Sequence, residues 1–446
     1  MFKDTIVALS STYGISALAV IRVSGNNVFK IIKKHLRKNF EPKKMYYDWF
    51  KKDSKKIDEI TWVYHKSPNS YTGEEMLEIF CHGGPKIIDE LIKILKENSR
   101  EAIEGEFSKR AVLNNKMDLI KAESINDMIH SETEISLEAS RNQITLGLSQ
   151  ELNKIEKELL DLSTSIEVEL DYPDDVAFES DDKEVLEKIK KIVLNSKDIL
   201  KNADNGIMAV HGIKTAIIGK PNSGKSTLLN ALLRKDRAIV TDIPGTTRDT
   251  IEESLNIRGI YLRIIDTAGI RESEDKIEKI GIKKSFESID NSDLVVFTID
   301  GTNIDQEDKQ IYQKIMNEFD KKEIIIAINK SDDLNFKNPS FIDSDDFVVI
   351  SAKNNDIRKL EDEIYNRYIK KLSYKKPSLT NKRQKNCLEE SISFLKKAEE
   401  NIKNGIPLDF IMYDVRKSLE KLYELNGKNY NEEMLENLFS NFCVGK

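Results

Sequence analysis

The sequence is poor in cysteine, and its three cysteines, Cys81, Cys387 and Cys443, lie far apart. So few and so scattered thiols do not form a disulfide framework, which favours a reducing environment. The sequence also lacks any apolar run near the roughly 20 residues that a membrane span needs. Its first residues show no signal-peptide pattern. These absences predict a cytoplasmic protein with no membrane partner.

An excess of positive charge is also missing, since the formal net charge is −7. This balance argues against a broad basic surface for nucleic acid. A local basic cluster at residues 382–385 fits a solvated helix end better than an RNA contact. The 446 residues are 39% hydrophobic and 33% charged. That length and composition predict about two to four globular domains that are rich in amphipathic helix.

Residues 219–226 form a glycine-bounded loop, Gly-Lys-Pro-Asn-Ser-Gly-Lys-Ser, between an apolar run and an amphipathic segment. Strand, loop and helix thus follow in the order that a phosphate-binding loop requires. Glycines let backbone N–H groups converge on phosphate oxygens, and the helix adds its positive N-terminal end. Lys225 is predicted to reach the β- and γ-phosphates, and Ser226 to bind Mg²⁺. The predicted nucleotide contacts here are Asn222, Ser223, Gly224, Lys225, Ser226 and Thr227.

Two motifs downstream have the features of nucleotide switches. Thr247 lies in Gly-Thr-Thr-Arg-Asp (245–249) and is a candidate second Mg²⁺ ligand. Asp266 follows the apolar strand predicted for 262–265 and is placed to hold a metal-bound water. The N–H of Gly269, three residues later, is placed to sense the γ-phosphate.

Two further motifs are suited to recognising a guanine base. Asn329-Lys330-Ser331-Asp332 follows a predicted strand, and the Asp332 carboxylate can accept hydrogen bonds from guanine N1–H and its exocyclic amine. Adenine lacks that donor pair. Backbone amides at 351–353 can meet the guanine oxygen. A single motif could be a chance turn, but five in this order predict a guanine-nucleotide-binding domain. The contacts predicted here are Asn329, Lys330, Asp332, Ser351, Ala352 and Lys353.

Apolar periodicity divides the remaining chain. The predicted domains are an α+β domain (1–116), a first helical segment (117–209), the α/β nucleotide domain (210–372) and a second helical segment (373–446). Apolar residues from Leu137 to Leu170 recur every three, four or seven residues, which predicts one long helix that ends before Pro173. A later helical pattern from Leu408 to Leu422 is predicted to be capped by Gly427. We favour a nucleotide domain inserted into one discontinuous helical domain over two separate bundles, because neither helical half alone buries a good core.

Several stretches outside the nucleotide domain carry a family resemblance. They are residues 4–8, 21–25, 71–75, 82–85, 105–111 and 113–119, and the terminal Cys443-Val444-Gly445-Lys446. With the five nucleotide motifs, they make the whole chain resemble the tRNA modification GTPase family MnmE, also called TrmE. The resemblance implies a Ras-like P-loop GTPase domain within a discontinuous helical domain. It also implies an N-terminal α+β domain that forms a homodimer and binds 5-formyl- or methylene-tetrahydrofolate.

The resemblance also assigns folate contacts. Arg22, Glu78, Lys116 and Lys446 match the family's residues. Arginine and lysine suit the carboxylates of folate, and the Glu78 carboxylate suits the amino and ring N–H groups of its pterin. Without the resemblance, Arg22 and Lys116 would be interpreted as members of surface ion pairs. Cys443 is open to two interpretations, a nucleophile with a lowered pKa or a small packing residue.

The resemblance further implies a partner, the FAD-dependent protein MnmG. In a heterooligomer, the two would add an aminomethyl or carboxymethylaminomethyl group to the wobble uridine of certain tRNAs. The present sequence has no flavin-binding glycine fingerprint, which fits a flavin held by the partner.

GTP hydrolysis must proceed without the glutamine of Ras-like proteins, because Ile270 occupies its position. The resemblance assigns the catalytic role to Glu278, which would orient water. It also implies a K⁺ ion as the positive charge, whereas Arg248 is an alternative arginine finger. The residues that match the K⁺ site are Asn222, Thr241, Ile243 and Thr246, and two nucleotide domains would meet there.

Two other functions compete with this interpretation. A ribosome-assembly GTPase shares the Gly-Thr-Thr-Arg-Asp motif but should carry a basic RNA-binding module, which the acidic balance opposes. A folate-dependent one-carbon enzyme with a merely regulatory nucleotide domain is the other. Binding of 5-formyltetrahydrofolate excludes the first of these, and analysis of wobble nucleosides separates the second from tRNA modification.

Overall fold

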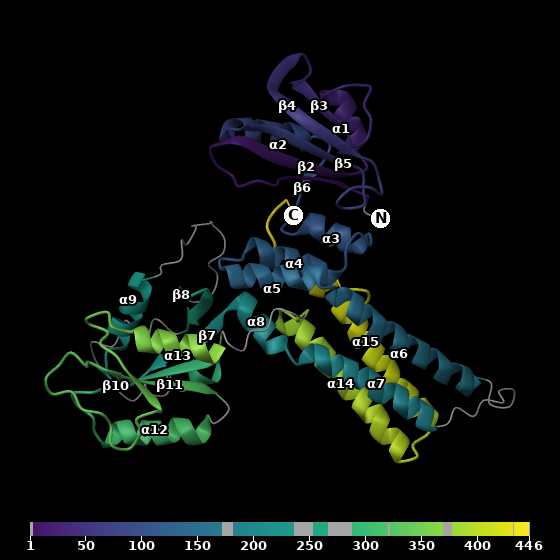
Figure 1. The fold of residues 1–446 in the computed structure, drawn as a ribbon. Helices are drawn as coiled ribbons and strands as arrows, with labels where there is room; N and C mark the ends of the chain where they lie inside the picture. Colours follow the sequence, from purple (N-terminus) through teal and green to yellow (C-terminus); the bar gives the residue numbers. More distant parts are fainter. Residues whose placement is uncertain are drawn as a thin grey trace. The chain divides into compact units, whose positions relative to one another are not determined.

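The computed structural model describes residues 3–171, 182–235, 253–265, 288–319, 322–368, 377–430 and 432–445 (Figure 1). The chain forms two compact units, of which one comprises residues 1–126, 149–196 and 386–446. The other comprises residues 127–148 and 197–385. Within the described residues, every helix is too short or too polar to cross a bilayer.

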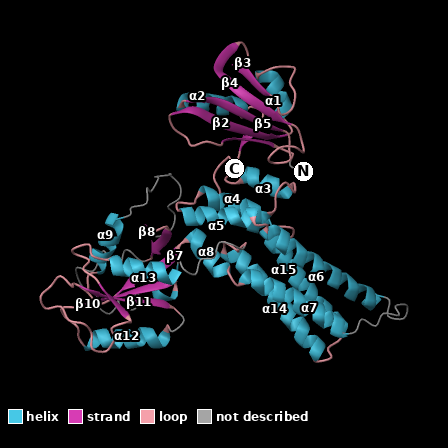
Figure 2. Ribbon diagram, in the orientation of Figure 1, coloured by secondary structure: helices cyan, strands magenta, loops and turns pink. Residues whose placement is uncertain are grey.

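The first unit contains a mixed sheet with the strand order β3-β4-β5-β2-β1-β6 (Figure 2). Its strands are β1 (Thr5–Leu9), β2 (Ser16–Gly25), β3 (Met45–Lys52), β4 (Lys55–His65), β5 (Met76–Gly83) and β6 (Arg100–Glu101). Alternate residues such as Ile21, Trp62 and Ile79 share one core with helices α1 (Val28–His35) and α2 (Pro85–Leu95). The residues between them, including Arg22 and Glu78, therefore lie on the opposite face of the sheet.

The C-terminal residues pack against the helices that follow this sheet. Helices α3 (Glu106–Leu113), α4 (Leu119–Ile129) and α16 (Glu432–Phe439) share an apolar cluster that includes Phe439 and Phe442. Gly105 has a φ of +63°, and a Cβ on it would lie 2.5 Å from the carbonyl oxygen of Phe439. Only glycine permits this approach, so one backbone position allows the end of the chain to dock.

Four long helices of the first unit lie side by side, although two precede and two follow the nucleotide domain in the sequence (Figure 1). They are α6 (Leu148–Asp171), α7 (Asp182–Leu200), α14 (Lys382–Lys403) and α15 (Leu408–Asn426). Asn426 donates to Glu156 over 2.7 Å, which joins α15 to α6. The hydroxyls of Ser391 and Ser418 are 2.8 Å apart and join α14 to α15. Helical segments before and after the nucleotide domain thus form one bundle.

The prediction of one long helix from Leu137 to Leu170 is wrong. Helix α5 (Glu134–Thr145) ends before Gly147, and α6 begins at Leu148. Gly147 has a φ of +76°, a conformation that ends a right-handed helix. Pro173, the predicted end of the helix, lies outside the described residues. Gly427, with a φ of +75°, caps α15 as predicted.

The second unit contains a sheet with the order β12-β11-β10-β7-β9-β8. Its strands are β7 (Ile213–Ile218), β8 (Glu253–Ile257), β9 (Ile260–Ile264), β10 (Leu294–Asp300), β11 (Glu323–Asn329) and β12 (Phe347–Val349), and its other helices are α8 (Ala203–His211), α9 (Lys225–Lys235), α12 (Gln306–Glu318) and α13 (Arg358–Tyr368). All neighbouring strands are parallel except β8 and β9. Separate apolar cores cover the two faces. The predicted fold class, with α+β, helical and α/β parts, is confirmed.

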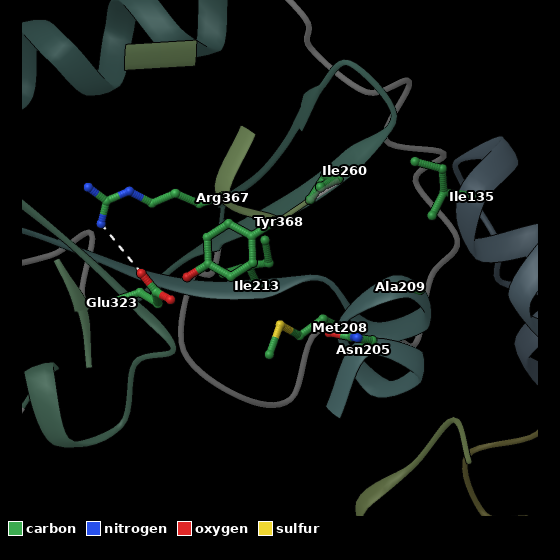
Figure 3. Close-up of a pocket in the computed structure, with 9 residues that line it drawn as sticks. All are labelled: Ile135, Asn205, Met208, Ala209, Ile213, Ile260, Glu323, Arg367 and Tyr368. Carbon is green, nitrogen blue, oxygen red and sulfur yellow. Dashed lines mark hydrogen bonds and ion pairs between the residues drawn. The ribbon is translucent and has the colours of Figure 1, made fainter. Parts of the chain in front are cut away.

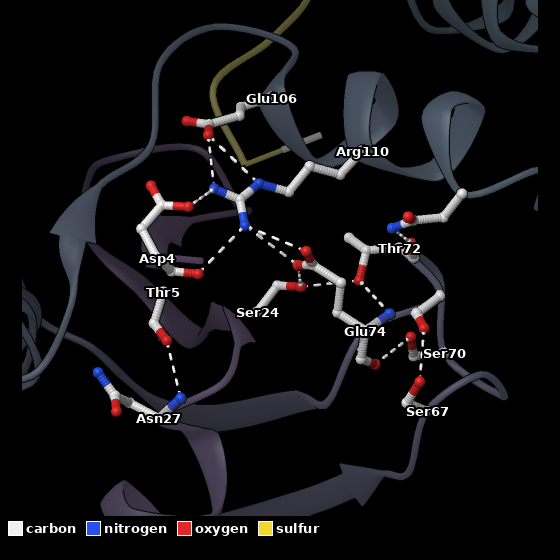
Figure 4. A network of polar contacts seen from close by, with 12 residues as sticks. Asp4, Thr5, Ser24, Asn27, Ser67, Ser70, Thr72, Glu74, Glu106 and Arg110 are labelled. Carbon is white, nitrogen blue, oxygen red and sulfur yellow. Dashed lines mark hydrogen bonds and ion pairs between the residues drawn. The ribbon is translucent and has the colours of Figure 1, made fainter. Parts of the chain in front are cut away.

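A buried ionic network fixes the start of α3 to the N-terminal sheet (Figure 4). The side chain of Arg110 is fully buried and lies 2.9 Å from Glu106, 2.8 Å from Asp4 and 3.2 Å from Glu74. Ser24 donates to Glu74 over 2.7 Å. Burial alone would raise the pKa of Glu106, but hydrogen bonds from the neighbouring arginines outweigh it and the pKa lies below its usual value. The carboxylates therefore depend on a buried cation.

We predict that Arg110→Met destabilises the first unit by about 3–5 kcal/mol, because it leaves buried carboxylates without their cation. Denaturant unfolding measures the loss. The matched control is Arg100→Met, since Arg100 contacts Asp4 and Glu106 too but its side chain is 48% exposed. That variant should lose less than about 1 kcal/mol. Equal losses in both variants would contradict the prediction.

Candidate functional site

The phosphate loop joins the end of β7 to the start of α9. A Cβ on Gly219 would lie 2.2 Å from the carbonyl oxygen of Thr298, and one on Gly224 would lie 2.1 Å from the Asn329 side-chain nitrogen. Asn222 between them has a φ of +62°. The loop thus presses its backbone against β10 and β11, and no larger residue fits at either glycine.

Lys225 begins α9, and its ammonium group is held by its own loop. It donates to the carbonyl oxygens of Gly219 and Lys220 over 2.9 and 2.7 Å. Burial lowers the pKa of Lys225 to about 8. Neutral carbonyls do not offset the desolvation of the charge, so phosphate anions would stabilise it strongly. Ser226 and Thr227 follow in the first turn of α9.

A second lysine, Lys220, clamps the loop from outside. Its ammonium lies 2.5 Å from Asp305 and 3.1 Å from Asp308. These two carboxylates form the capping box at the start of α12. Sequence analysis missed this clamp, although the Asp-x-x-Asp spacing is a recognisable helix-start signal. The loop is therefore anchored to α12 as well as to the sheet.

The predicted base-recognition residues gather at the ends of β11 and β12. Asn329 is buried and donates to the carbonyl oxygen of Ser223 over 3.0 Å, while its own oxygen accepts from the Ala352 amide over 3.0 Å. Ser351 donates to Asp332 over 2.5 Å, and this hydrogen bond lowers the Asp332 pKa. The carboxylate is therefore ionised and can accept donors from a base.

Two lysines complete this end of the site. Lys330 has a φ of +69° and lies 2.5 Å from Asp300 at the end of β10. Lys353 is exposed, with its ammonium 3.9 Å from Asp332. The structure thus brings the predicted residues of the first, fourth and fifth motifs together at one edge of the sheet.

The other predicted residues lie outside the described part of the chain. These are Thr241, Ile243, Thr246, Thr247, Asp266, Gly269, Glu278 and Lys446. Their roles stay predictions.

A second polar cluster lies on the outer face of the N-terminal sheet. Arg22 and Glu78 are directly opposite each other on β2 and β5, and their side chains form an ion pair of 2.9 Å. The guanidinium of Arg22 lies over the Tyr71 ring at 5.6 Å, and it contacts the carbonyl oxygen of Gly445 at 3.4 Å. Ser10 also donates to that carbonyl, over 2.9 Å. The end of the chain is thus brought beside Arg22.

The two remaining residues of this cluster are less buried. Lys116 is exposed, and its aliphatic carbons lie against Gly73, close to Tyr71 in sequence. Cys443 is exposed, whereas Phe442 before it is buried. Both interpretations of Cys443, a nucleophile and a small packing residue, stay predictions.

Comparison with known proteins gives matches along the whole chain. A family model described as the MnmE helical domain matches residues 119–443, and one described as the GTP-binding protein TrmE N-terminus matches residues 5–116. The tRNA modification GTPase MnmE of Petrotoga mobilis is 55% identical over 455 residues, covering 100% of both chains. The protein of that name from Thermotoga maritima is 41% identical and covers 99% of this chain and 100% of its own. The chain belongs to the MnmE family.

Family membership confirms the resemblance and the prediction of an enzyme, a P-loop GTPase. The full-length relatives are named tRNA modification GTPases, which favours that interpretation over ribosome assembly. Among solved structures, Era in complex with MgGDPNP and part of 16S ribosomal RNA is 30% identical, covering 35% of this chain and 56% of that chain with a TM-score of 0.27.

Figure 3 shows the residues that line a small cavity in this MnmE family member. Its volume is about 120 Å³. It is lined by α5, α8, α13 and the first residues of β7, β9 and β11, whereas the nucleotide motifs follow the last residues of the strands. The cavity therefore belongs to the opposite edge of the sheet.

We predict that GDP binding takes up a proton at alkaline pH. The Lys225 pKa of about 8 means that the neutral form dominates at pH 9, and phosphate binding restores the charged form. Uptake should approach one proton at pH 9 and fall to about a tenth of one at pH 7. Calorimetric titration in buffers of different ionisation enthalpy measures it. Lys225→Arg, which stays charged, should abolish the uptake. The same uptake at both pH values would contradict the prediction.

Proposed function

We propose that this GTPase acts in tRNA modification and uses a tetrahydrofolate one-carbon unit to modify the wobble uridine of certain tRNAs. The observation that carries the proposal is the presence in one chain of two differently built sites. One is a loop suited to nucleotide phosphates, and the other is the Arg22–Glu78 pair beside the end of the chain. The relatives that match at full length are named tRNA modification GTPases, which supports the same function.

The folate would bind on the outer face of the N-terminal sheet. Arg22, Lys116 and Lys446 would attract its carboxylates, and Glu78 would accept the N–H donors of its pterin. The described residues fit this group, because the Glu78 carboxylate is already held by Arg22 and the carbonyl oxygen of Gly445 lies next to the same guanidinium. Folate bound there would supply the one-carbon unit.

In the nucleotide site, Ser226 and Thr247 would hold Mg²⁺, and Asp266 and Gly269 would respond to the γ-phosphate. The K⁺ site would comprise Asn222, Thr241, Ile243 and Thr246, and Glu278 would orient the attacking water. The exposed Asn222, in its left-handed conformation, suits this role because its amide oxygen is a hard ligand. Contact between two nucleotide domains of a homodimer would complete the K⁺ site.

Redox chemistry would come from an FAD-dependent partner, MnmG, with which the chain would form a heterooligomer. The tRNA would be bound largely by that complex, since the net charge of this chain is −7. We place the complex in the cytoplasm and expect no membrane contact.

The direct test is mass spectrometry of tRNA nucleosides from a strain that lacks this gene. We expect the modified wobble uridine to disappear and to return with the wild-type gene. Gly224→Ala should not restore it, because the new Cβ would collide with Asn329. Gly259→Ala is the matched control, since Gly259 has the similar φ of +92° but its nearest neighbour is a side-chain carbon at 3.2 Å. Unchanged nucleosides in the deletion strain would refute the function.

The K⁺ site has its own test. GTP hydrolysis should be at least about tenfold slower in Na⁺ than in K⁺, because a cation of the wrong size stabilises the transition-state charge poorly. Steady-state phosphate release measures both rates. Asn222→Ala should slow the reaction in K⁺ and remove the difference between the two salts. Equal rates of the wild-type protein in both salts would exclude this mechanism.

A further inference from the structure

A histidine that no motif predicted contacts the carboxylate of Glu78. His65 ends β4, and its Nε2 lies 3.1 Å from Glu78 Oε2, while Arg22 Nε lies 2.9 Å from Glu78 Oε1. Each carboxylate oxygen therefore has one partner, from β4 on one side and β2 on the other. The pairing of the three strands explains this arrangement, because β5 lies between β4 and β2 and all three side chains project from the outer face.

The contacts among Arg22, His65 and Glu78 determine that Glu78 is ionised and which nitrogen of His65 carries a proton. Hydrogen bonding from His65 and the charge of Arg22 lower the pKa of Glu78, against an opposing effect of burial. An ionised carboxylate only accepts hydrogen bonds, so the proton of the contact must be on His65 Nε2. About a fifth to a quarter of each of the three side chains is exposed, so the carboxylate can still be reached.

A carboxylate oxygen has two lone-pair positions. Within the described residues, the structure gives each Glu78 oxygen one hydrogen-bond partner. One position on each oxygen is thus left, and together they match a ligand with two adjacent N–H donors. Rotation of the carboxylate would misalign this pair, and two fixed partners on opposite sides prevent it.

We propose that His65 is a positioning residue that holds the Glu78 carboxylate in the orientation that accepts the paired N–H donors of a pterin ring. The inference rests on the proposed folate function and adds to it a residue that the family resemblance did not assign. His65 would act through Glu78 and need not touch the ligand.

The test is equilibrium binding of 5-formyltetrahydrofolate to the full chain, measured by calorimetry. His65→Leu removes the donor and lets the Glu78 carboxylate rotate, which should weaken binding about tenfold. His65→Gln places an amide N–H near the position of Nε2 and should bind within about twofold of wild type. Glu78→Gln should lose more affinity than either His65 variant, because it replaces one hydrogen-bond acceptor by a donor.

The matched control is His82→Leu. His82 contacts a carboxylate of the same domain, with its Nδ1 2.7 Å from Asp58 Oδ1, but not Glu78. It should bind folate as wild type does, and thermal unfolding should show that all the variants are folded. If the wild-type chain binds folate, two results would overturn the role of His65 alone. One is an unchanged affinity in His65→Leu, and the other is an equal loss of affinity in His65→Leu and His65→Gln. No binding by the wild-type chain would overturn the folate function together with it.

Discussion

The buried side-chain amide of Asn329 holds the two halves of the nucleotide site together. Its nitrogen donates to Ser223 in the phosphate loop, and its oxygen accepts from Ala352 in the loop after β12. Neither loop can move alone without leaving a buried polar group unpaired, at a cost of about 1–3 kcal/mol. Gly224 is required at the point of contact, because any Cβ would occupy the space of the amide. One side chain thus links the phosphate loop to the loop that carries predicted base contacts.

The parts of this site that could be predicted from the sequence are those whose chemistry lies in consecutive residues. The loop at 219–226 is one, because its glycines, lysine and serine act on phosphate through the local backbone. Lys220 belongs to the same loop, yet its partners lie on α12, more than 80 residues away, and only the fold brings them together. The role of His65 could not be predicted for the same reason, since its contact with Glu78 depends on the pairing of β4 with β5.

The errors in the fold have equally specific causes. Apolar residues before and after Gly147 keep helical spacing, so periodicity alone joined α5 to α6, although the positive φ of that glycine ends the first helix. Residues 45–65 were predicted only as part of the α+β domain, without individual strands, but they form the hairpin β3–β4, in which Trp62 is fully buried. By contrast, Gly427 was predicted as a helix cap because its position follows directly from where the apolar periodicity of α15 stops.

The charged partners of Lys225 and Arg22 differ, and this difference bears on the ligand proposed for each site. The hydrogen bonds that the described residues give Lys225 go to neutral carbonyl oxygens, so a bound anion would supply the negative charge that these partners lack, which suits a polyphosphate. Arg22 already has Glu78 as a counter-ion, so an anion alone gains less there. A ligand that brings carboxylates for Arg22 and also N–H donors for Glu78 satisfies both members of the pair. The outer face of the sheet therefore favours a molecule with both kinds of group over a simple anion.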